Sequence, residues 1–212
     1  MPKTRNSLFL IASFGLTLFG AMLLLVLKRG HAPQVDAWVH TAMAQWRMDA
    51  LVPLVKMLTD MNSFTGALLF SVPVVAIFIW KRWYSDLAYF AAATLGATGL
   101  FIAVKLTVAR MRPEASAIEI GGFSFPSGHT TMATAMAFAL YFVLREKTGS
   151  KLLQQLLCCM ALGWVLLIGW SRLYLGVHWF TDVLGGFGLG LFWVTLLKLF
   201  WPSRRGGETT AG

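Results

Sequence analysis

Six apolar windows divide this 212-residue chain, and most polar residues gather between them. Each window approaches the roughly 17–25 residues that a helix needs to cross a bilayer. The windows cover residues 7–27, 64–80, 87–108, 129–144, 152–170 and 183–201, and the fourth is the shortest. This pattern predicts an all-α integral-membrane protein with six transmembrane helices in a single domain, residues 1–212.

The segments flanking these windows support further expectations. Between the first two windows, Val35, Trp38, Val39, Ala42 and Trp46 fall on one helical stripe. The stripe predicts an amphipathic helix on the outer membrane surface, although a loop packed on the bundle is an equally open interpretation. The Gly- and Thr-rich tail, residues 202–212, is predicted to be disordered.

The first window resembles a signal peptide only in part. Lys3 and Arg5 precede an apolar core of about 20 residues, which exceeds the usual 7–15 of a signal peptide. The dipeptide Lys28-Arg29 follows, where a cleavage site would need small residues. We expect a retained helix.

Composition and charge support a membrane protein and give its orientation. Only 13% of residues are charged, against about 25% in soluble domains. The net charge of +9 is scattered between apolar stretches, so no nucleic-acid partner is expected. With the N-terminus inside, inner segments hold ten Lys and Arg residues and outer ones eight, three of which the chemistry below uses. We therefore predict cytoplasmic termini. The membrane itself is expected to be a bacterial inner membrane.

Charges that stand at the ends of predicted spans indicate a functional site. A charged side chain at mid-helix costs about 2.5–3.5 kcal/mol, so an apolar chain keeps such residues only where they are used. With six spans, the third-to-fourth and fifth-to-sixth connections lie on one side, here the outer one. The residues gathered there are Lys105, Arg112, His129, Arg172, His178 and Asp182.

Two motifs in the first of these connections point to phosphate binding. Lys105 and Arg112 are seven residues apart, which predicts that they share a helical face over two turns. Interfacial anchors that snorkel to headgroups are the simpler explanation of this pair alone. Ser127 is a predicted N-cap with Gly128 in the first turn, and such a helix start also binds anions. Capping does not explain His129, just inside the helix.

The motif in the second connection points to a nucleophile. His178 and Asp182 are spaced i and i+4 and face each other if helical. A carboxylate on one imidazole nitrogen fixes the tautomer and frees the other nitrogen to attack. Neutralisation of an interfacial histidine by Asp182 is the alternative for this motif alone.

The three motifs together resemble the type 2 phosphatidic acid phosphatase superfamily. Its signature, Lys-x6-Arg-Pro, Pro-Ser-Gly-His and Ser-Arg-x5-His-x3-Asp, matches residues 105–113, 126–129 and 171–182 at all eleven specified positions. The resemblance implies a phosphohistidine on His178, oriented by Asp182, with His129 as acid and then base. It implies that phosphate binds to Lys105, Arg112, Ser127, Gly128 and Arg172.

Such a site is expected to need neither a metal nor another cofactor. General acid–base catalysis supplies about 10²–10⁴ of an acceleration that reaches about 10²¹ for phosphate monoesters. Positioning and charge supply the rest, and three cations with a helix N-terminus fit that task. The cations disfavour a protonated His129, so we expect a bound phosphate dianion to restore its proton.

The position of the site at the bilayer edge predicts a lipid substrate. Only twelve residues separate Pro113 from Pro126, so no large cap domain is expected, and Gly186 and Gly190 predict close helix packing. Undecaprenyl pyrophosphate is favoured by the outward orientation, with phosphatidylglycerophosphate and phosphatidic acid as candidates. A lipid phosphotransferase, a vanadate-dependent haloperoxidase and a non-catalytic transport or binding protein are the alternatives. The sequence does not determine the oligomeric state.

Overall fold

The computed structural model describes residues 2–28 and 33–201, and this part of the chain contains helices but no strands. The predicted all-α class is confirmed, and each apolar window coincides with a helix, the last window extending one residue beyond its helix, to Trp201. The helices are α1 (Pro2–Lys28), α2 (Gln34–Trp46), α3 (Val52–Asp60), α4 (Phe64–Trp80), α5 (Tyr84–Val108), α6 (Gly128–Lys147), α7 (Lys151–Tyr174) and α8 (Phe180–Phe200), with a 3-10 turn η1 (Asp49–Leu51). The predicted disordered tail and Arg29 lie outside the described residues.

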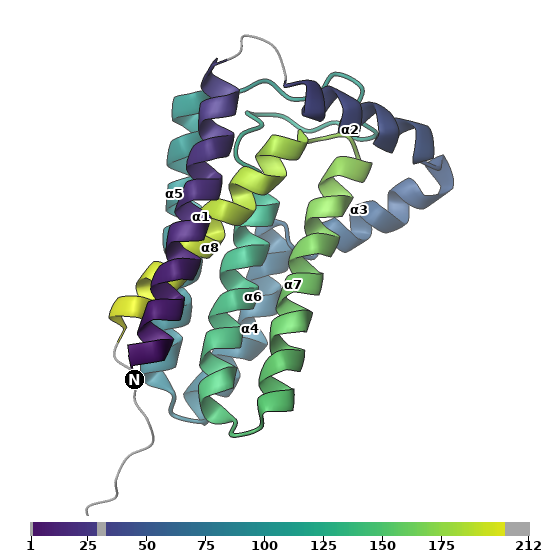
Figure 1. The fold of residues 1–212 in the computed structure, drawn as a ribbon. Helices are drawn as coiled ribbons and strands as arrows, with labels where there is room; N and C mark the ends of the chain where they lie inside the picture. The colour runs from purple at the N-terminus through teal and green to yellow at the C-terminus, as the bar shows by residue number, and fades with distance from the viewer. Residues whose placement is uncertain (1, 29–32, 202–212) are drawn as a thin grey trace, which may run out of the picture.

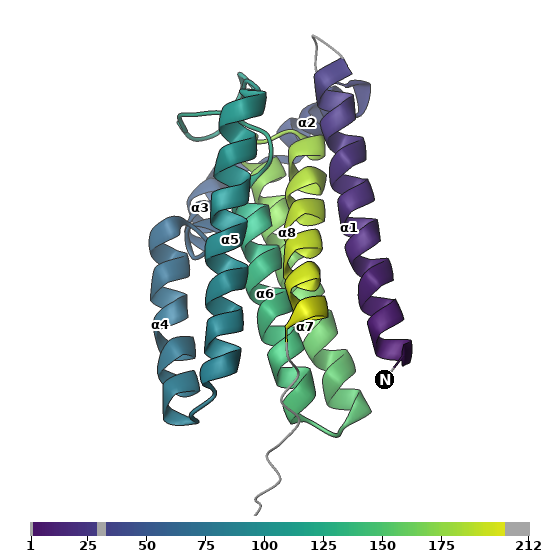
Figure 2. The ribbon, with the colours of Figure 1, turned by 90° about the vertical axis from the view of Figure 1, so that its left-hand side faces the viewer.

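The six longer helices run side by side, and α2 and α3 flank one end of the bundle (Figure 1). The connections α5–α6 and α7–α8 meet at that end, beside α2, whereas the turns α4–α5 and α6–α7 lie at the other end. The quarter turn in Figure 2 shows α5 and α8 with α6 behind them, and α1 and α4 at the two sides. The connections α5–α6 and α7–α8 thus lie at the same end of the bundle, as predicted.

Four of these helices are long and apolar enough to cross a membrane by themselves. They are α1 from Arg5, α5, α7 and α8. The segments Asp49–Asp60 and Thr65–Trp80, bent by 45° at their junction, give a fifth if they count as one broken span. Helix α6 does not pass the same test of length and hydropathy.

The position of α6 explains its lower hydropathy. It packs against α5, α7 and α8, so protein surrounds most of its surface. Its first two turns bury Thr130, Thr131 and Thr134, and two of their hydroxyls bond to carbonyls of the same helix: Thr131 Oγ1 to Ser127 O at 2.9 Å and Thr134 Oγ1 to Thr130 O at 2.7 Å. A helix sheltered by its neighbours needs no lipid-facing apolar surface.

Glycines in α8 allow two neighbouring helices to approach closely. A Cβ on Gly186 would lie 2.6 Å from Ser127 O, and one on Gly190 would lie 2.7 Å from Thr131 O. Both atoms are backbone atoms of the α6 start, which cannot move aside cheaply. The close packing expected at this pair is confirmed, and it fixes α6 against α8 next to the motifs at the starts of these helices.

The segment predicted to lie on the outer surface is helical, but its buried side differs from the predicted stripe. In α2, Asp36 and Val39 are buried, whereas Val35, Trp38 and Trp46 are exposed. Val39 lies at the edge of the stripe nearest Asp36, so most of the stripe is outside the buried side. The reason is a polar contact that hydrophobic periodicity does not register: Asp36 binds the start of α8.

We predict that Gly186→Ala and Gly190→Ala each destabilise the protein by about 1–3 kcal/mol, as overpacking does, because α6 and α8 must separate. Thermal unfolding in detergent measures the loss. Gly163→Ala is the matched control, since a Cβ at this α7 position meets nothing within 4 Å. Equal unfolding temperatures for all three variants would contradict the packing argument.

Candidate active site

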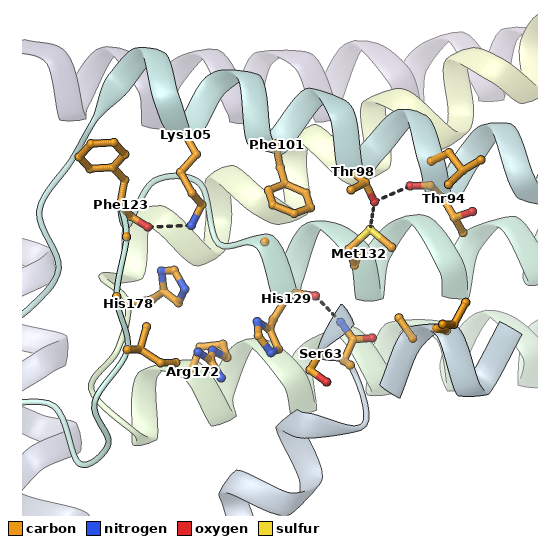
Figure 3. Close-up of a pocket in the computed structure, with 18 of the residues that line it drawn as sticks. Ser63, Thr94, Thr98, Phe101, Lys105, Phe123, His129, Met132, Arg172 and His178 are labelled. Carbon is orange, nitrogen blue, oxygen red and sulfur yellow. Dashed lines mark hydrogen bonds between the residues drawn. The ribbon is translucent and has the colours of Figure 1, made fainter. Parts of the chain in front are cut away.

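A cavity of about 480 Å³ opens where α4, α5, α6 and α7 meet the connections α5–α6 and α7–α8 at one end of the bundle. One end of the cavity is basic, and no Asp or Glu is among the residues that line it. Figure 3 shows Lys105, His129, Arg172 and His178 turned toward this common space. The residues predicted to carry chemistry that line it are Lys105, Arg112, Gly128, His129, Arg172 and His178.

The segment after α5 brings Arg112 to the cavity without a helix, so the predicted common helical face is wrong. Helix α5 ends at Val108, and Ala109 takes the left-handed conformation (φ 47°) that commonly ends helices. Pro113 also disfavours helical geometry at Arg112. Lys105 thus reaches the site from the last turn of α5, and Arg112 from an irregular loop.

Neutral acceptors, rather than carboxylates, hold the three cations that line the cavity. Lys105 Nζ donates to Phe123 O at 2.7 Å, and Arg112 donates from Nε to Gly122 O at 3.0 Å and from Nη1 to Val177 O at 2.7 Å. A carbonyl orients a cation without cancelling its charge, so the positive charge stays available to an anion.

Arg172 is also held by a neutral acceptor, and its side chain is fully buried. Its side chain is 1% exposed, and Nη1 donates to Thr59 Oγ1 at 3.2 Å. Its Nε is buried and has no hydrogen-bond partner among the described residues. Because an unpaired buried charge is costly, a cavity-lining guanidinium in this state favours an anionic ligand.

His178 and Asp182 are paired, but not as two residues of one helix. Helix α8 begins at Phe180, so His178 precedes it, and Gly176 (φ 67°) turns the chain after α7. Asp182 Oδ2 reaches back to accept from Trp179 N at 2.8 Å and lies 3.3 Å from His178 Nδ1. The pairing was predicted, whereas the helical geometry proposed for it is wrong.

The contacts of His178 determine its tautomer. Its Nε2 lies 3.2 Å from Arg112 Nη1, and a guanidinium can only donate. Nε2 therefore carries the lone pair, and Nδ1 carries the proton that faces Asp182. This is the tautomer in which the nitrogen at the cavity is nucleophilic.

Burial and charge keep His178 neutral. Its side chain is 2% exposed, and this burial, followed by the cations Arg172, Arg112 and Lys105, holds its pKa well below the usual 6.5. Burial also lowers the pKa of Arg112, which Asp182 opposes. A neutral imidazole among cations is a poor base toward water but an available nucleophile toward phosphorus.

The α6 start contributes two of its three predicted residues to the cavity. Ser127 is the N-cap, as predicted, and its Oγ accepts from Thr130 N at 3.4 Å. It does not line the cavity, and its own N–H donates to Asp182 O at 3.0 Å. Gly128 and His129 do line it, and Asn62 Nδ2 fixes this turn by donating to His129 O at 2.7 Å.

Several residues of the site were missed by sequence reasoning. Asp182 also accepts a hydrogen bond from Ser124 Oγ, and its Oδ1 accepts from Arg110 Nη1 at 2.6 Å. Arg110 in turn binds Asp36 of α2. The available signal is an acidic residue, Asp36, and a third arginine, Arg110, in the connections between the apolar windows. Within residues 2–28 and 33–201, no group of three or more His, Cys, Asp or Glu is placed to hold a metal ion.

The fold and site define a class: an all-helical protein with apolar, span-length helices and a pair of histidines in a cation-lined cavity at one end of the bundle. The sequence matches the PAP2 superfamily over residues 83–205, more than half of the chain, and the chain belongs to this superfamily. The resemblance inferred from the three motifs is thereby confirmed.

Two curated relatives carry phosphatase names. The chain is 38% identical over 99 residues to phosphatidylglycerophosphatase B of Bacillus subtilis (strain 168), covering 46% of this chain and 49% of the relative. It is 36% identical over 80 residues to YbjG of Escherichia coli (strain K12), provisionally named an undecaprenyl-diphosphatase, covering 38% of this chain and 36% of the relative. The chain thus spans half or less of the length of these relatives.

Two solved structures share the fold. A crystal structure described as the first transmembrane PAP2 type phosphatidylglycerolphosphate phosphatase from Bacillus subtilis matches with a TM-score of 0.70 and 27% identity, covering 87% of this chain and 94% of that one. Aquifex aeolicus LpxE matches with a TM-score of 0.62 and 24% identity, covering 77% and 94%, which is a likeness of fold.

We predict that His178 stays a neutral Nδ1–H tautomer as the pH falls below 6.5, where an ordinary histidine takes up a proton. Its lowered pKa means that the unfolded chain binds this proton first, so stability is lost as the pH falls below 6.5. Nitrogen-15 NMR of histidine-labelled protein measures the tautomer, and His178→Gln assigns the signal. Protonation near pH 6.5 or an Nε2–H tautomer would contradict the geometry.

Proposed function

We propose that this protein is a membrane-embedded phosphatase that hydrolyses the phosphate or pyrophosphate headgroup of a lipid through a phosphohistidine on His178. The observation that carries the proposal is the convergence of Lys105, Arg112 and Arg172 on one cavity with a neutral His178 and with His129. The phosphatase names of the relatives support the same reaction class.

In the first step, the Nε2 lone pair of His178 forms a bond to phosphorus as the bond from phosphorus to the lipid oxygen breaks. His129 gives its proton to the departing oxygen, and Asp182 stabilises the charge that develops on the imidazole. Arg112 Nη1 lies 3.2 Å from Nε2, and it transfers its hydrogen bond to a phosphoryl oxygen when the headgroup enters.

In the second step, His129 takes a proton from water, and the water oxygen attacks phosphorus. The bond between phosphorus and His178 Nε2 breaks, its electron pair returns to the nitrogen, and inorganic phosphate leaves. For His129 to act first as an acid, the phosphate dianion must offset the three nearby cations. Gly128 and the positive end of α6 add to the binding of the phosphate, whereas Ser127 contributes by capping that helix.

The other end of the cavity supports a lipid substrate. It extends between α4 and α5, where Ala67, Leu68, Leu95 and Met132 line it. Three hydroxyl residues there turn their polar atoms to their own helices: Ser71 to Ala67 O at 2.8 Å, Thr94 to Phe90 O at 2.9 Å and Thr98 to Thr94 O at 2.9 Å. The groove therefore presents an apolar wall to a chain that extends from the basic end.

We further propose six membrane spans, with α4 and the sheltered α6 added to the four helices that meet the length and hydropathy test. Both termini then lie in the cytoplasm of a bacterium, and the site faces outward with α2 at the membrane surface. The exposed Trp38 and Trp46 of α2 suit that interface. Undecaprenyl pyrophosphate is the favoured substrate, and phosphatidylglycerophosphate and phosphatidic acid are the other candidates.

We predict that substitutions of His129 and His178 have opposite effects on the accumulation of phosphoenzyme. With 4-nitrophenyl phosphate, whose leaving group needs no proton, His129→Gln should give a burst of nitrophenol and accumulate acid-labile phosphohistidine. Its turnover of lipid phosphates should fall by about 10²–10⁴-fold, the usual worth of general acid–base catalysis. His178→Gln should show no burst and lose at least about 10⁴-fold of activity.

Rapid-mixing absorbance and protein-bound phosphate measure these outcomes, with EDTA present throughout. His40→Gln is the matched control, because His40 lies at the same end of the bundle but does not line the cavity. Unchanged phosphate release by His178→Gln would disprove the mechanism. Transfer of phosphate to an added acceptor lipid in place of water would establish a phosphotransferase instead.

We predict that Thr94→Phe, which fills the apolar groove, raises KM for long-chain lipid phosphates by roughly tenfold. Excluding about two methylenes costs about 1.6 kcal/mol of burial. KM for 4-nitrophenyl phosphate should not change, since this substrate has no tail. Thr107→Phe is the control, as Thr107 is an exposed residue of α5 outside the groove. An equal effect on both substrates would rule out a tail site.

A further inference from the structure

Arg110 is a cation of the active-site region that does not line the cavity. Its Nη1 donates to Asp182 Oδ1 at 2.6 Å and to Thr181 Oγ1 at 2.8 Å, and its Nη2 donates to Asp36 Oδ2 at 2.7 Å. Two carboxylates thus share one guanidinium, whose side chain is 10% exposed. Arg110 differs in this respect from Lys105, Arg112 and Arg172. In the described structure, those three cations contact only neutral protein groups and the His178 ring.

Asp36 connects this arginine to the start of α8. The side chain is fully buried, and its carboxylate accepts from Thr181 N at 2.8 Å and from Thr181 Oγ1 at 2.7 Å. The N-cap of α8 is Trp179, which offers no side-chain acceptor, so Asp36 of α2 satisfies an N–H of the first turn from outside. An aspartate at this helix start is also favoured by the helix dipole.

These contacts form a continuous chain of buried charges that ends at His178. Asp36 holds Arg110, Arg110 holds Oδ1 of Asp182, and Oδ2 of Asp182 lies 3.3 Å from His178 Nδ1. One carboxylate oxygen of Asp182 is thus fixed by the arginine, which leaves the other directed at the imidazole. The four residues come from α2, the loop after α5, α8 and the loop before α8.

We infer that Asp36 and Arg110 are positioning residues for the reaction at His178: Arg110 clamps Asp182, and Asp36 cancels the charge that Arg110 would otherwise impose on it. The inference rests on the proposed function in taking His178 as the attacking group. Its two parts have different physical reasons, one geometric and one electrostatic.

The geometric part concerns the direction of the carboxylate. A carboxylate held at a single oxygen can rotate about its side chain, and the hydrogen bond to Nδ1–H would then lengthen. Arg110 removes that freedom by donating from Nη1 to Asp182 Oδ1 while Nη2 donates to Asp36 Oδ2, because the guanidinium is planar and donates in fixed directions. The result is a fixed tautomer and a fixed ring orientation at His178.

The electrostatic part concerns the charge that grows on His178 during attack. As Nε2 bonds to phosphorus, the imidazole becomes cationic, and Asp182 stabilises it. An uncompensated Arg110 beside Asp182 would oppose this, adding to the three cations of the cavity. Asp36 supplies the balancing negative charge on the far side of Arg110, away from the phosphate site, so the cavity keeps its affinity for anions.

The test compares Asp36→Asn, Arg110→Met, Arg110→Lys and the double variant Asp36→Asn/Arg110→Met in the full-length protein in detergent. Asp36→Asn and Arg110→Met should lower kcat by about 10–100-fold, the usual effect of losing a supporting partner behind a functional ligand. KM should change by less than about threefold, since the phosphate-binding cations are intact. Arg110→Lys should recover part of kcat, and the double variant should be no slower than the slower single variant.

Two further measurements separate positioning from simple stabilisation. The His178 Nδ1–H proton signal should shift in Asp36→Asn and Arg110→Met, and unfolding temperatures report the stability of each variant. Asp49→Asn is the matched control, because it removes an exposed negative charge at the same end of the bundle, outside this chain of contacts. It should change neither kcat nor the proton signal.

Unchanged kcat and an unchanged Nδ1–H signal in both single variants would overturn the inference, as would a rise in KM with kcat intact. If Asp36→Asn fails to fold, the two Arg110 variants provide the test. A lower kcat for Arg110→Met than for Arg110→Lys supports the inference, and equal kcat values count against a positioning role. If the wild-type protein releases no phosphate from any substrate, the proposed function fails, whereas the proton signal still tests the chain of contacts alone.

Discussion

The structure depends on one constraint: three cations must sit together at the edge of an apolar bundle without being neutralised. Lys105, Arg112 and Arg172 meet it by donating to carbonyls and to a hydroxyl, which orient the charge but leave it available. Carboxylate partners would stabilise these cations more strongly and would compete with a phosphate for the same donors. The positive charge kept in the cavity is therefore a cost to folding and, in the proposed function, the source of anion binding.

The helices around the cavity are arranged so that this cost is tolerated. Glycines of α8 bring its backbone against α6, and α6 gives up lipid contact for contact with its neighbours. The start of α6 is thereby fixed relative to the start of α8. This also fixes His129, in the first turn of α6, relative to His178, which precedes α8. A rigid frame suits the proposed reaction, because positioning and charge, rather than proton transfer, supply most of the rate in phosphoryl transfer.

Four basic residues in and beside the cavity divide into two roles. Three face the cavity, and Arg110 faces Asp182 and Asp36 instead. The division lets the protein place the carboxylate of Asp182 beside His178 without losing positive charge at the cavity. The same contacts dock α2 on α8, which joins α2 to the residues around the cavity. The contacts that hold the start of α8 are thus also those that lead to His178.

The sequence by itself determined the helices, the side on which the motifs gather and the pairing of His178 with Asp182. These follow from local patterns: apolar windows of fixed length, an N-cap at Ser127 and a spacing of four residues. Only the tertiary structure decided that Arg112 leaves the helix and that Ser127 lies behind the cavity. It alone showed that Asp36 reaches Thr181, 145 residues away along the chain. Contacts between residues so far apart along the chain depend on how separate helices pack. No local sequence pattern indicates which buried charged residues form pairs. The low hydropathy of α6 has the same explanation, because its neighbours, rather than its own periodicity, decide how much of it meets lipid.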